Sequence, residues 1–176
     1  MSADAFLKFG TRNGDNVAAL EGESTDSKYK KWFQFESCGF GVVNNATIDS
    51  GTQGGGSGKA EFNKFTFSKK LDSSSPVLWE ACAMGSHITE AWLYVRKSGD
   101  SVPYVKFYFK NCFINKLAWS GSGEAPSESC EFDFGGMYVM YYKQDSVTGK
   151  IDTATGIGAN YNRQEGSTEL AWKDPA

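Results

Sequence analysis

The segment FDFGGMYVMYY, residues 132 to 142, constrains this chain most because its pattern changes halfway along. Phe132 and Phe134 alternate with acidic residues, which is typical of a β-strand with one face in water. After two glycines, residues 137 to 142 place apolar or aromatic side chains on both faces of a strand. Leaving one such side chain in water costs about 1.5–3 kcal/mol, so both faces need a cover. Two covers remain open: the chain's own tail, or a second copy of the chain.

Strand-like segments recur along most of the chain. It has 26 aromatic residues (5 Trp, 8 Tyr and 13 Phe), with 20 glycines and only 4 prolines, a composition that favours strands and tight turns. A straight strand over Val102–Ser120 would reach about 60 Å, too long for one small domain. The apolar phase changes along it, which predicts bulges or bends near Asn111 and Lys116. The expected strands are Ala5–Phe9, Lys31–Val43 with a bend at Gly39 or Gly41, Ala60–Lys70, Ile88–Lys97, Val102–Ser120 and Ser127–Lys143.

One helix is predicted with a defined start and end. Ser75 is placed as its N-cap, Pro76 at its first position and Gly85 just past its end. Its apolar residues share one face, which would cover part of the sheet. At 176 residues, the whole chain 1–176 is expected to form a single domain, with residues 144–176 as a divergent tail.

Charge and hydropathy exclude several classes of protein. The chain carries 18 Lys and Arg against 21 Asp and Glu, a net charge of −3, which argues against binding to nucleic acid or to an anionic membrane. No window approaches the roughly 20 apolar residues of a membrane-spanning helix, so no membrane insertion is expected. The opening residues lack the basic and apolar stretches of a secretory signal peptide.

The chemistry of an enzyme or a metal site is not indicated. His87 is the one histidine, and its position directly after the expected helix favours a structural role. Glu128 and Glu131 would lie on opposite faces of a strand, so they do not form an acid/base pair. No catalytic residue, cofactor or metal ion is predicted. Three disulfide connectivities are possible on paper, but buried thiols are favoured for Cys38, Cys82, Cys112 and Cys130.

Residues 44 to 59, NNATIDSGTQGGGSGK, have almost nothing to bury. At 16 residues, this segment exceeds the length above which a loop without secondary structure is usually functional or disordered. It is expected to be an extended glycine-rich loop.

Read in order, these segments resemble the haemolysin-coregulated protein (Hcp) family, the tube-forming subunits of the bacterial type VI secretion system. The match covers most of the chain, as an ordered series of short motifs rather than one decisive motif. It consists of Ala5–Lys8, Gly22–Asp26 with Lys30 and Trp32, Gly58–Lys59, Phe65–Phe67 with Lys69 and Lys70, Ser75–Pro76 with Leu78, Ala81–Cys82 and Gly85, His87–Ile88, Arg96–Lys97, Tyr104, Ser120–Gly123, Pro126–Ser129 and Phe134–Gly135.

The resemblance implies a mainly β fold, an antiparallel β-barrel of two packed sheets with one flanking α-helix. It also implies homohexameric rings that stack as a hollow tube, with sheath subunits, a spike protein and small effector proteins as partners. The chain would reside in the bacterial cytoplasm before assembly and would then be secreted to the exterior or into target cells without a signal peptide. No nucleic acid is expected among its partners.

Three surfaces follow from combining the resemblance with the sequence pattern. The lateral ring contact is assigned to Met137, Tyr138, Val139, Met140, Tyr141 and Tyr142. The contact between stacked rings is assigned to Asn44, Asn45, Thr47, Asp49, Gln53, Gly54, Gly55, Gly56 and Lys59. The lumen is assigned to Gly39, Ser120 and Ser122. Lys106 and Lys110 are expected to face away from the barrel interior.

Two other classes of function remain open. The abundance of aromatic residues also suits a monomeric β-sandwich that binds a ligand or a carbohydrate, with exposed rings as stacking platforms. A serine hydrolase using His87 is a weaker alternative because the chain lacks a nucleophile elbow and a recognisable triad.

Overall fold

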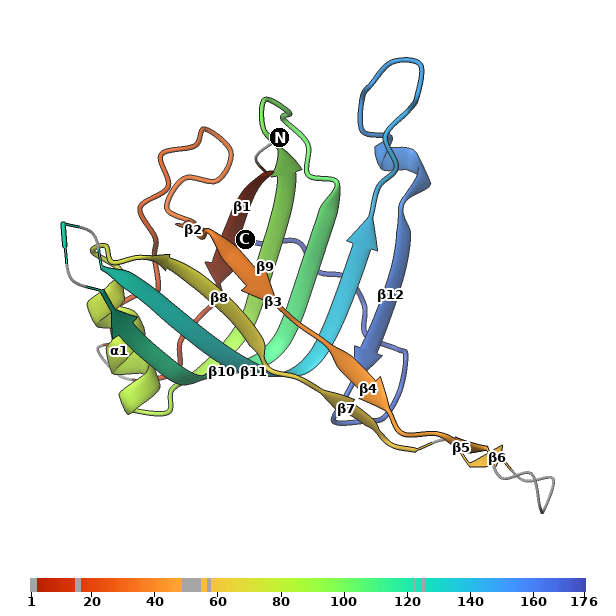
Figure 1. Cartoon of the computed structure of the whole chain (residues 1–176), viewed down its shortest axis with the longest axis horizontal. Coiled ribbons are helices and arrows are strands. Elements are labelled where there is room, and N and C mark those ends of the chain that lie inside the picture. Colours follow the sequence, from red (N-terminus) through yellow and green to blue (C-terminus); the bar gives the residue numbers. More distant parts are fainter. Residues whose placement is uncertain (1–2, 15–16, 49–54, 57, 122, 125) are drawn as a thin grey trace.

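Three long antiparallel strands form the framework of the computed structural model: β9 (His87–Lys97), β10 (Val105–Ser120) and β11 (Ser127–Tyr141) (Figure 1). The structure describes residues 3–14, 17–48, 55–56, 58–121, 123–124 and 126–176. Shorter strands extend the sheet on both sides. They are β1 (Ala3–Phe9), β2 (Phe33–Gln34), β3 (Ser37–Gly39), β8 (Phe65–Lys70) and β12 (Ile157–Asn162).

The strands form one bent sheet in the order β2-β1-β9-β10-β11-β8-β3, with β12 also paired to β11. The predicted fold class, mainly β and antiparallel with a flanking helix, is therefore confirmed. The two expected layers are two halves of this one sheet. Among the described residues, its hydrogen-bonded path ends at β2 and β3 and does not close into a ring.

The sheet bends where β10 leaves its partner β9 and where β11 changes its partner from β8 to β12. Asn111 adopts a φ of +55°, and a Cβ added to Gly135 would lie only 3.1 Å from the Asn111 Cβ. The register shifts again between Ile114 and Lys116. Both predicted irregularities, near Asn111 and near Lys116, are confirmed. They divide the sheet into a broad half (β2, β1, β9, β12, residues 105–113 and 134–141) and a narrow half (β3, β8, residues 114–120 and 127–132).

An aromatic core joins the two halves. The Phe109 ring from the broad half lies 5.2 Å from the rings of both Phe65 and Phe132 in the narrow half. Phe9 reaches the same group, 5.7 Å from Phe132. These four side chains are at most 3% exposed. Since the halves share one core, the orientation of the narrow half depends on these contacts.

The predicted helix is present as α1 (Ser75–Ala83), which covers one end of the core with Leu78 and Ala81. Its N-cap is Ser74 and not the predicted Ser75. The Ser75 hydroxyl is instead buried and donates to Glu128 Oε2 at 2.9 Å, which draws Ser75 into the first helical turn. Gly85 follows the helix with a φ of +58°, as its predicted position requires.

The face of the broad half that points away from the core is covered by a second cluster of mainly aromatic side chains. Tyr29 and Trp32 come from the segment before β2, and Leu170 and Trp172 come from the tail. They pack on Phe6, Trp92, Tyr94, Tyr108 and Tyr138 of the sheet. The broad half is therefore apolar on both faces over much of its area.

The segment expected as a glycine-rich loop extends a ribbon away from the body of the molecule (Figure 1). Its base pairs β4 (Val42–Asn44) with β7 (Ala60–Phe62), and β5 (Thr47–Ile48) pairs with β6 (Gly55–Gly56) farther out. A Cβ at Gly58 would lie 2.4 Å from the Asn45 carbonyl oxygen, so only glycine fits this close approach. A short 3₁₀ turn, η1 (Thr153–Thr155), precedes β12.

Substitution of Phe132 by alanine is expected to lower the free energy of unfolding by about 3–5 kcal/mol, because it opens a cavity between the two halves. The matched control is Phe113→Ala, since Phe113 lies on the same sheet with 41% of its surface exposed. Urea unfolding followed by tryptophan fluorescence would measure both changes. Equal losses for the two variants would contradict the central role of the core contact.

Candidate functional site

The outward face of the narrow half carries short side chains in three cross-strand rows. Its centre is made of hydroxyls, and the Oγ atoms of Ser37 and Ser68 lie 2.7 Å apart. The rows are Gly39, Thr66, Glu131 and Lys116; Ser37, Ser68, Ser129 and Ala118; and Lys70, Ser127 and Ser120. We call this surface the hydroxyl face. Apart from Lys70, Lys116 and Glu131 at its margins, its side chains are short, and the face as a whole is polar, so it offers little apolar area for adhesion.

The hydroxyl face unites two of the three residues assigned to the lumen. Gly39 and Ser120 are both exposed and lie at opposite margins of this one surface. Ser122 lies outside the described residues. A Cβ at Gly39 would lie 2.8 Å from the Thr66 hydroxyl, so the lack of a side chain at Gly39 leaves room for Thr66 on the neighbouring strand.

A buried ion pair supports the hydroxyl face from below. Lys69 Nζ lies 2.8 Å from Glu128 Oε2, and the two side chains are 1% and 0% exposed. They stand directly opposite each other on β8 and β11. The Trp119 indole donates to the second Glu128 oxygen at 2.7 Å. Because buried charges must be paired and hydrogen-bonded, this network locks three strands together at that end of the sheet.

The same lysine ties the helix to the sheet. Lys69 Nζ donates to Asp72 Oδ1 at 2.7 Å and to Ser75 Oγ at 3.0 Å, at the start of α1. Burial acts to raise the pKa of Asp72, but hydrogen bonds from Lys69 and Ser74 outweigh it and hold that pKa below its ordinary value. Asp72 is therefore ionised in the folded protein at neutral pH.

Sequence reasoning did not anticipate this network. The signal was present, because Lys69 has the strand parity of Phe65 and Phe67, and Glu128 has that of Phe132. The expectation that Glu128 and Glu131 face opposite ways is confirmed. Glu128 is buried, whereas Glu131 is on the hydroxyl face, 3.4 Å from Lys64 Nζ.

The segment Met137–Tyr142 is covered on one face by the tail. The Tyr138 ring lies 5.6 Å from the Trp172 ring. The absence of a side chain at Gly156 leaves room for Tyr142 and Met140, and its absence at Gly158 leaves room for Tyr138 and Met140, since a Cβ at either glycine would lie within about 3 Å of them. The tail, one of the two covers that the sequence left open, is therefore present for this face.

The other face of the same segment is only partly covered. Met137 joins the core, but Tyr141 is 47% exposed, and Ile157 opposite it is 60% exposed. Cross-strand neighbours extend this area into a surface that we call the Tyr141 patch. It consists of Val95, Val105, Phe107, Val139, Tyr141 and Ile157. Of the residues predicted for the lateral contact, Val139 and Tyr141 belong to this patch.

The stacking segment is only partly described. Asn44, Asn45 and Lys59 are exposed at the base of the projecting ribbon, and the backbones of Thr47, Gly55 and Gly56 pair farther out. Asp49, Gln53 and Gly54 lie outside the described residues. The base of the ribbon also displays Val42 and Val43, which are 52% and 49% exposed.

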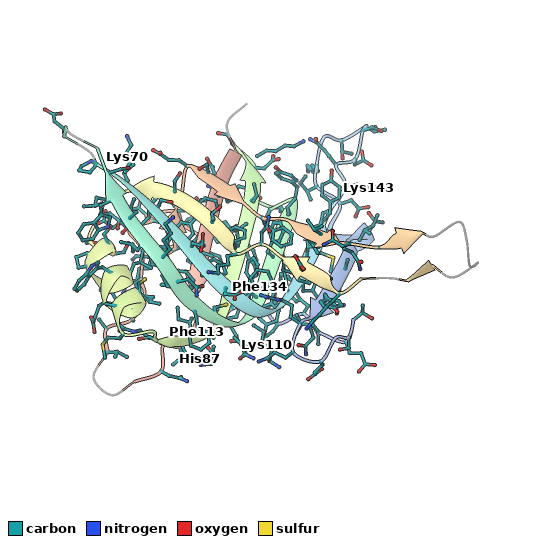
Figure 2. The ribbon with its side chains drawn as sticks, turned by 60° about the horizontal axis from the view of Figure 1, so that its bottom comes forward. Lys70, His87, Lys110, Phe113, Phe134 and Lys143 are labelled. Atoms are coloured by element: carbon teal, nitrogen blue, oxygen red, sulfur yellow. The ribbon has the colours of Figure 1, made fainter. Side chains whose placement is uncertain are left out.

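A cleft of about 640 Å³ lies where the ribbon leaves the bend. Arg163 lies over the rings of Phe62 and Phe134, at 5.5 and 5.2 Å, and pairs with Asp133. Figure 2 shows Phe134 close to this bend, with Phe113, His87 and Lys110 along the neighbouring edge. Lys110 is exposed and lies on the outer side of the sheet, as expected from its parity.

The histidine and the thiols have structural surroundings. His87 Nδ1 lies 2.9 Å from Asn13 Nδ2, and its ring packs at a tilt against Phe113, with the ring centroids 5.0 Å apart. All four cysteines are free thiols. Cys112 and Cys130 are buried as predicted, and burial raises the pKa of both. Cys38 is exposed, contrary to prediction, because it lies on β3 at the end of the sheet.

Neither a metal site nor a membrane-spanning helix is found among the described residues. In the part of the chain that the structure describes, no group of three or more His, Cys, Asp and Glu residues could hold a metal ion. No helix among the described residues is long and apolar enough to cross a membrane.

A bent antiparallel sheet with one flanking helix and several exposed surfaces defines a class of β-rich proteins. A family model for the type VI secretion system effector Hcp matches residues 6–141, and this chain belongs to that family. Protein hcp1 of Pseudomonas aeruginosa is 28% identical over 106 residues, which span 58% of this chain and 65% of that protein.

Solved structures agree with this assignment over nearly the whole chain. A type six secretion system protein superposes with a TM-score of 0.82 at 24% identity, covering 94% of this chain and 99% of that one. Hcp1 from Salmonella typhimurium superposes with a TM-score of 0.72 at 27% identity, covering 94% and 98%. The first comparison supports the fold alone, because its sequence identity is low.

The Asp72→Asn variant is expected to lose part of the pH dependence of stability. The pKa of Asp72 is lowered in the folded chain, so its contribution is present above the unfolded pKa and disappears as pH falls through the folded pKa. The gap in urea midpoint between wild type and variant should shrink from about pH 5 to pH 2. Asp100→Asn is the control, since Asp100 has no ion pair among the described residues. A gap that stays constant over this range would refute the assignment.

Proposed function

We propose that this chain is a structural, non-catalytic subunit of the type VI secretion tube, which assembles as homohexameric rings that stack around a lumen. The Tyr141 patch is the observation that carries the proposal. It is apolar, it lies on paired strands of the sheet, and Tyr141 and Ile157 in it remain about half exposed. A second copy would complete the burial that the tail begins on the opposite face.

A ring requires contact between unlike surfaces of identical subunits. The Tyr141 patch supplies one surface at the margin of the broad half, and the second surface would lie elsewhere on the neighbour. A stable contact of this kind buries about 800 Å² on each partner. The predicted lateral segment, Met137–Tyr142, thus contributes mainly through Val139 and Tyr141, because Tyr138 and Met140 face the tail.

Contacts between stacked rings are assigned to the projecting ribbon. Its base is a paired two-stranded backbone, and the exposed side chains described there include Asn44, Asn45 and Lys59 beside Val42 and Val43. A tube that forms and dissociates suits such a modest contact.

The hydroxyl face is assigned to the lumen, where it would carry small effector proteins. Its Ser, Thr, Gly and Ala positions, together with the charged Lys70, Lys116 and Glu131, give a cargo few apolar contacts, so the cargo could be held weakly and released. Sheath subunits and the spike protein are the expected outer and terminal partners. The chain would assemble in the bacterial cytoplasm and leave through the type VI system to the exterior or into target cells.

The carbohydrate-binding alternative is not favoured by the arrangement of aromatic side chains. Trp32 and Trp92 are at most 7% exposed and belong to the second cluster. Trp79 and Trp119 are about half exposed but lie on separate elements, α1 and β10.

The Tyr141→Asp variant is expected to shift the assembly toward single chains, because a charge would be buried in the lateral contact. Light scattering should give the wild type a mass near six times 19.3 kDa and the variant a mass near 19.3 kDa. Tyr138→Asp is a poorer test, since it would also disturb the packing of Trp172. Val147→Asp is the matched control, because Val147 is 91% exposed and is not a residue of the patch. A hexamer that survives Tyr141→Asp would remove this patch from the contact.

Assembly should protect the hydroxyl face from large reagents. In a chain carrying Cys38→Ser, the Ser129→Cys thiol should react with a small maleimide in assembled tubes but resist a maleimide linked to a large polymer. Lys28→Cys is the control, since exposed Lys28 lies on the segment that covers the outer face of the broad half, away from the narrow half, and it should react with both reagents. Equal labelling of Ser129→Cys by both reagents in tubes would contradict the lumen assignment.

A further inference from the structure

The connection between β11 and β12 presents an apolar side chain to water. Val147 lies at the tip of the loop over residues 143–152, which we call the Val147 loop. It is 91% exposed, more than any other large apolar residue that the structure describes. Single exposed apolar side chains are common on protein surfaces. This one differs because the loop around it holds it in a fixed position.

Hydrogen bonds within the Val147 loop fix its tip. Asp145 Oδ1 accepts from the Val147 N–H at 2.9 Å and from the Thr148 N–H at 2.6 Å. The Asp145 N–H donates to the Lys150 carbonyl oxygen at 2.8 Å, and the Gly149 N–H donates to the Asp145 carbonyl oxygen at 2.9 Å. Hydrogen bonds from Thr148 and then Val147 also hold the pKa of Asp145 below its ordinary value, so this carboxylate is charged at neutral pH. The tip is therefore preorganised, which lowers the entropy cost of inserting it into a partner.

A hollow with aromatic walls lies at the other end of β12. It is the cleft of about 640 Å³ at the base of the ribbon, which we call the bend cleft. Phe62 and Tyr161 line it, and their rings stack at 5.3 Å. Phe113, which is 41% exposed, lines the same cleft. Pockets that take small ligands measure about 300–1,000 Å³, so the bend cleft has room for an apolar side chain and the turn that carries it.

The Val147 loop and the bend cleft lie at opposite ends of one strand pair. The loop joins β11 to β12 beyond the pair of Tyr141 and Ile157, and the cleft lies past the pair of Gly136 and Asn162. Figure 1 shows the loop above one end of β12 and the base of the ribbon beside the other. From Ile157 to Asn162 the strand rises about 17 Å, so a chain cannot place its own loop in its own cleft.

A projecting side chain at one end and a hollow at the other favour a contact between copies in the same orientation. The two surfaces are unlike, so each contact leaves one free loop and one free cleft, and copies add in an open line. Stacked rings require contacts of this kind. Both sides have balanced charge, with Lys143, Asp145, Lys150 and Asp152 on the loop and Lys59, Glu61, Asp133 and Arg163 in the cleft. Net charge therefore does not oppose the contact.

We propose that the Val147 loop of each subunit inserts into the bend cleft of a subunit in the next ring, with Val147 against the aromatic walls. The inference rests on the proposed function, because it needs rings that stack. It adds a second contact to the one assigned to the projecting ribbon. Residues 59–62 at the base of the ribbon line the cleft, so a ring that receives the ribbon also lies beside the cleft. Each ring would make the contact six times, so a modest gain per subunit is enough.

The first test joins two populations of rings that are assembled separately and then mixed. One population carries Val147→Cys and the other carries Glu61→Cys, both in a chain with Cys38→Ser. Glu61 is exposed and lines the bend cleft. A short thiol cross-linker should join residue 147 of one chain to residue 61 of another, as mass spectrometry of the linked peptides would show. Rings with Lys28→Cys in place of Glu61→Cys are the control and should give no such product.

Each outcome separates the inference from the proposed function. Stacked rings without this cross-link would overturn the inference and leave the tube function standing. Rings that do not stack, or a sample that stays at the mass of one chain and gives no cross-link, would overturn both. The cross-link in a sample that stays free of rings would overturn the proposed function and leave the contact between copies.

The second test changes the tip of the loop. Val147→Asp should leave single rings intact, but it should raise the protein concentration needed for stacking at least about tenfold, because a charge would enter an aromatic hollow. Val147→Leu should stack as the wild type does. Thr153→Asp is the control for added charge, since Thr153 is exposed on η1 in the same connection. Negative-stain micrographs over a concentration series would measure stacking, and unchanged stacking of Val147→Asp would overturn the inference.

Discussion

The broad half of the sheet is apolar on both faces, and the rest of the structure is arranged around this constraint. A sheet of this kind is stable in water only if each face is covered. The narrow half and α1 cover one face through the core around Phe109 and Phe132. The segment before β2 and the tail cover the other through Trp32 and Trp172. Where neither cover reaches, the Tyr141 patch remains.

The bend turns this constraint into two different surfaces. At Asn111 and Gly135, the long strands leave the broad half and continue as the narrow half. Past the bend, the inward side of β11 packs on the core and the outward side carries serines. The buried pair of Lys69 and Glu128 holds the far end of the narrow half and the start of α1 together. One strand thus contributes an apolar contact surface at one end and the hydroxyl face at the other.

Much of the fold could be predicted from local patterns. The long strands, the two irregularities near Asn111 and Lys116, and the helix ending before Gly85 all follow from strand alternation, changes of apolar phase and glycine placement. The N-cap was predicted one residue late, because Ser75 is drawn inward by Glu128, a partner 53 positions away. Cys38 was expected to be buried, but whether a strand lies at the end of a sheet depends on the pairing of all the others. The assembly surfaces stay predictions, supported by where Gly39, Ser120 and Tyr141 lie.

The sequence by itself determined that this is a mainly β chain with a strand that needs cover on both faces, since periodicity and composition are local properties that survive without a three-dimensional arrangement. Its ordered series of short motifs gave the resemblance to the Hcp family, which the family model confirms. Only the tertiary structure decided which segment of the chain covers each face of the sheet. Trp172 reaches Tyr138 across 34 positions of sequence, and Lys69 reaches Glu128 across 59. Such contacts depend on the bend, the register and the return path of the tail together. The division of residues 137 to 142 into a face that the tail covers and a face that stays partly exposed is therefore a property of the folded molecule.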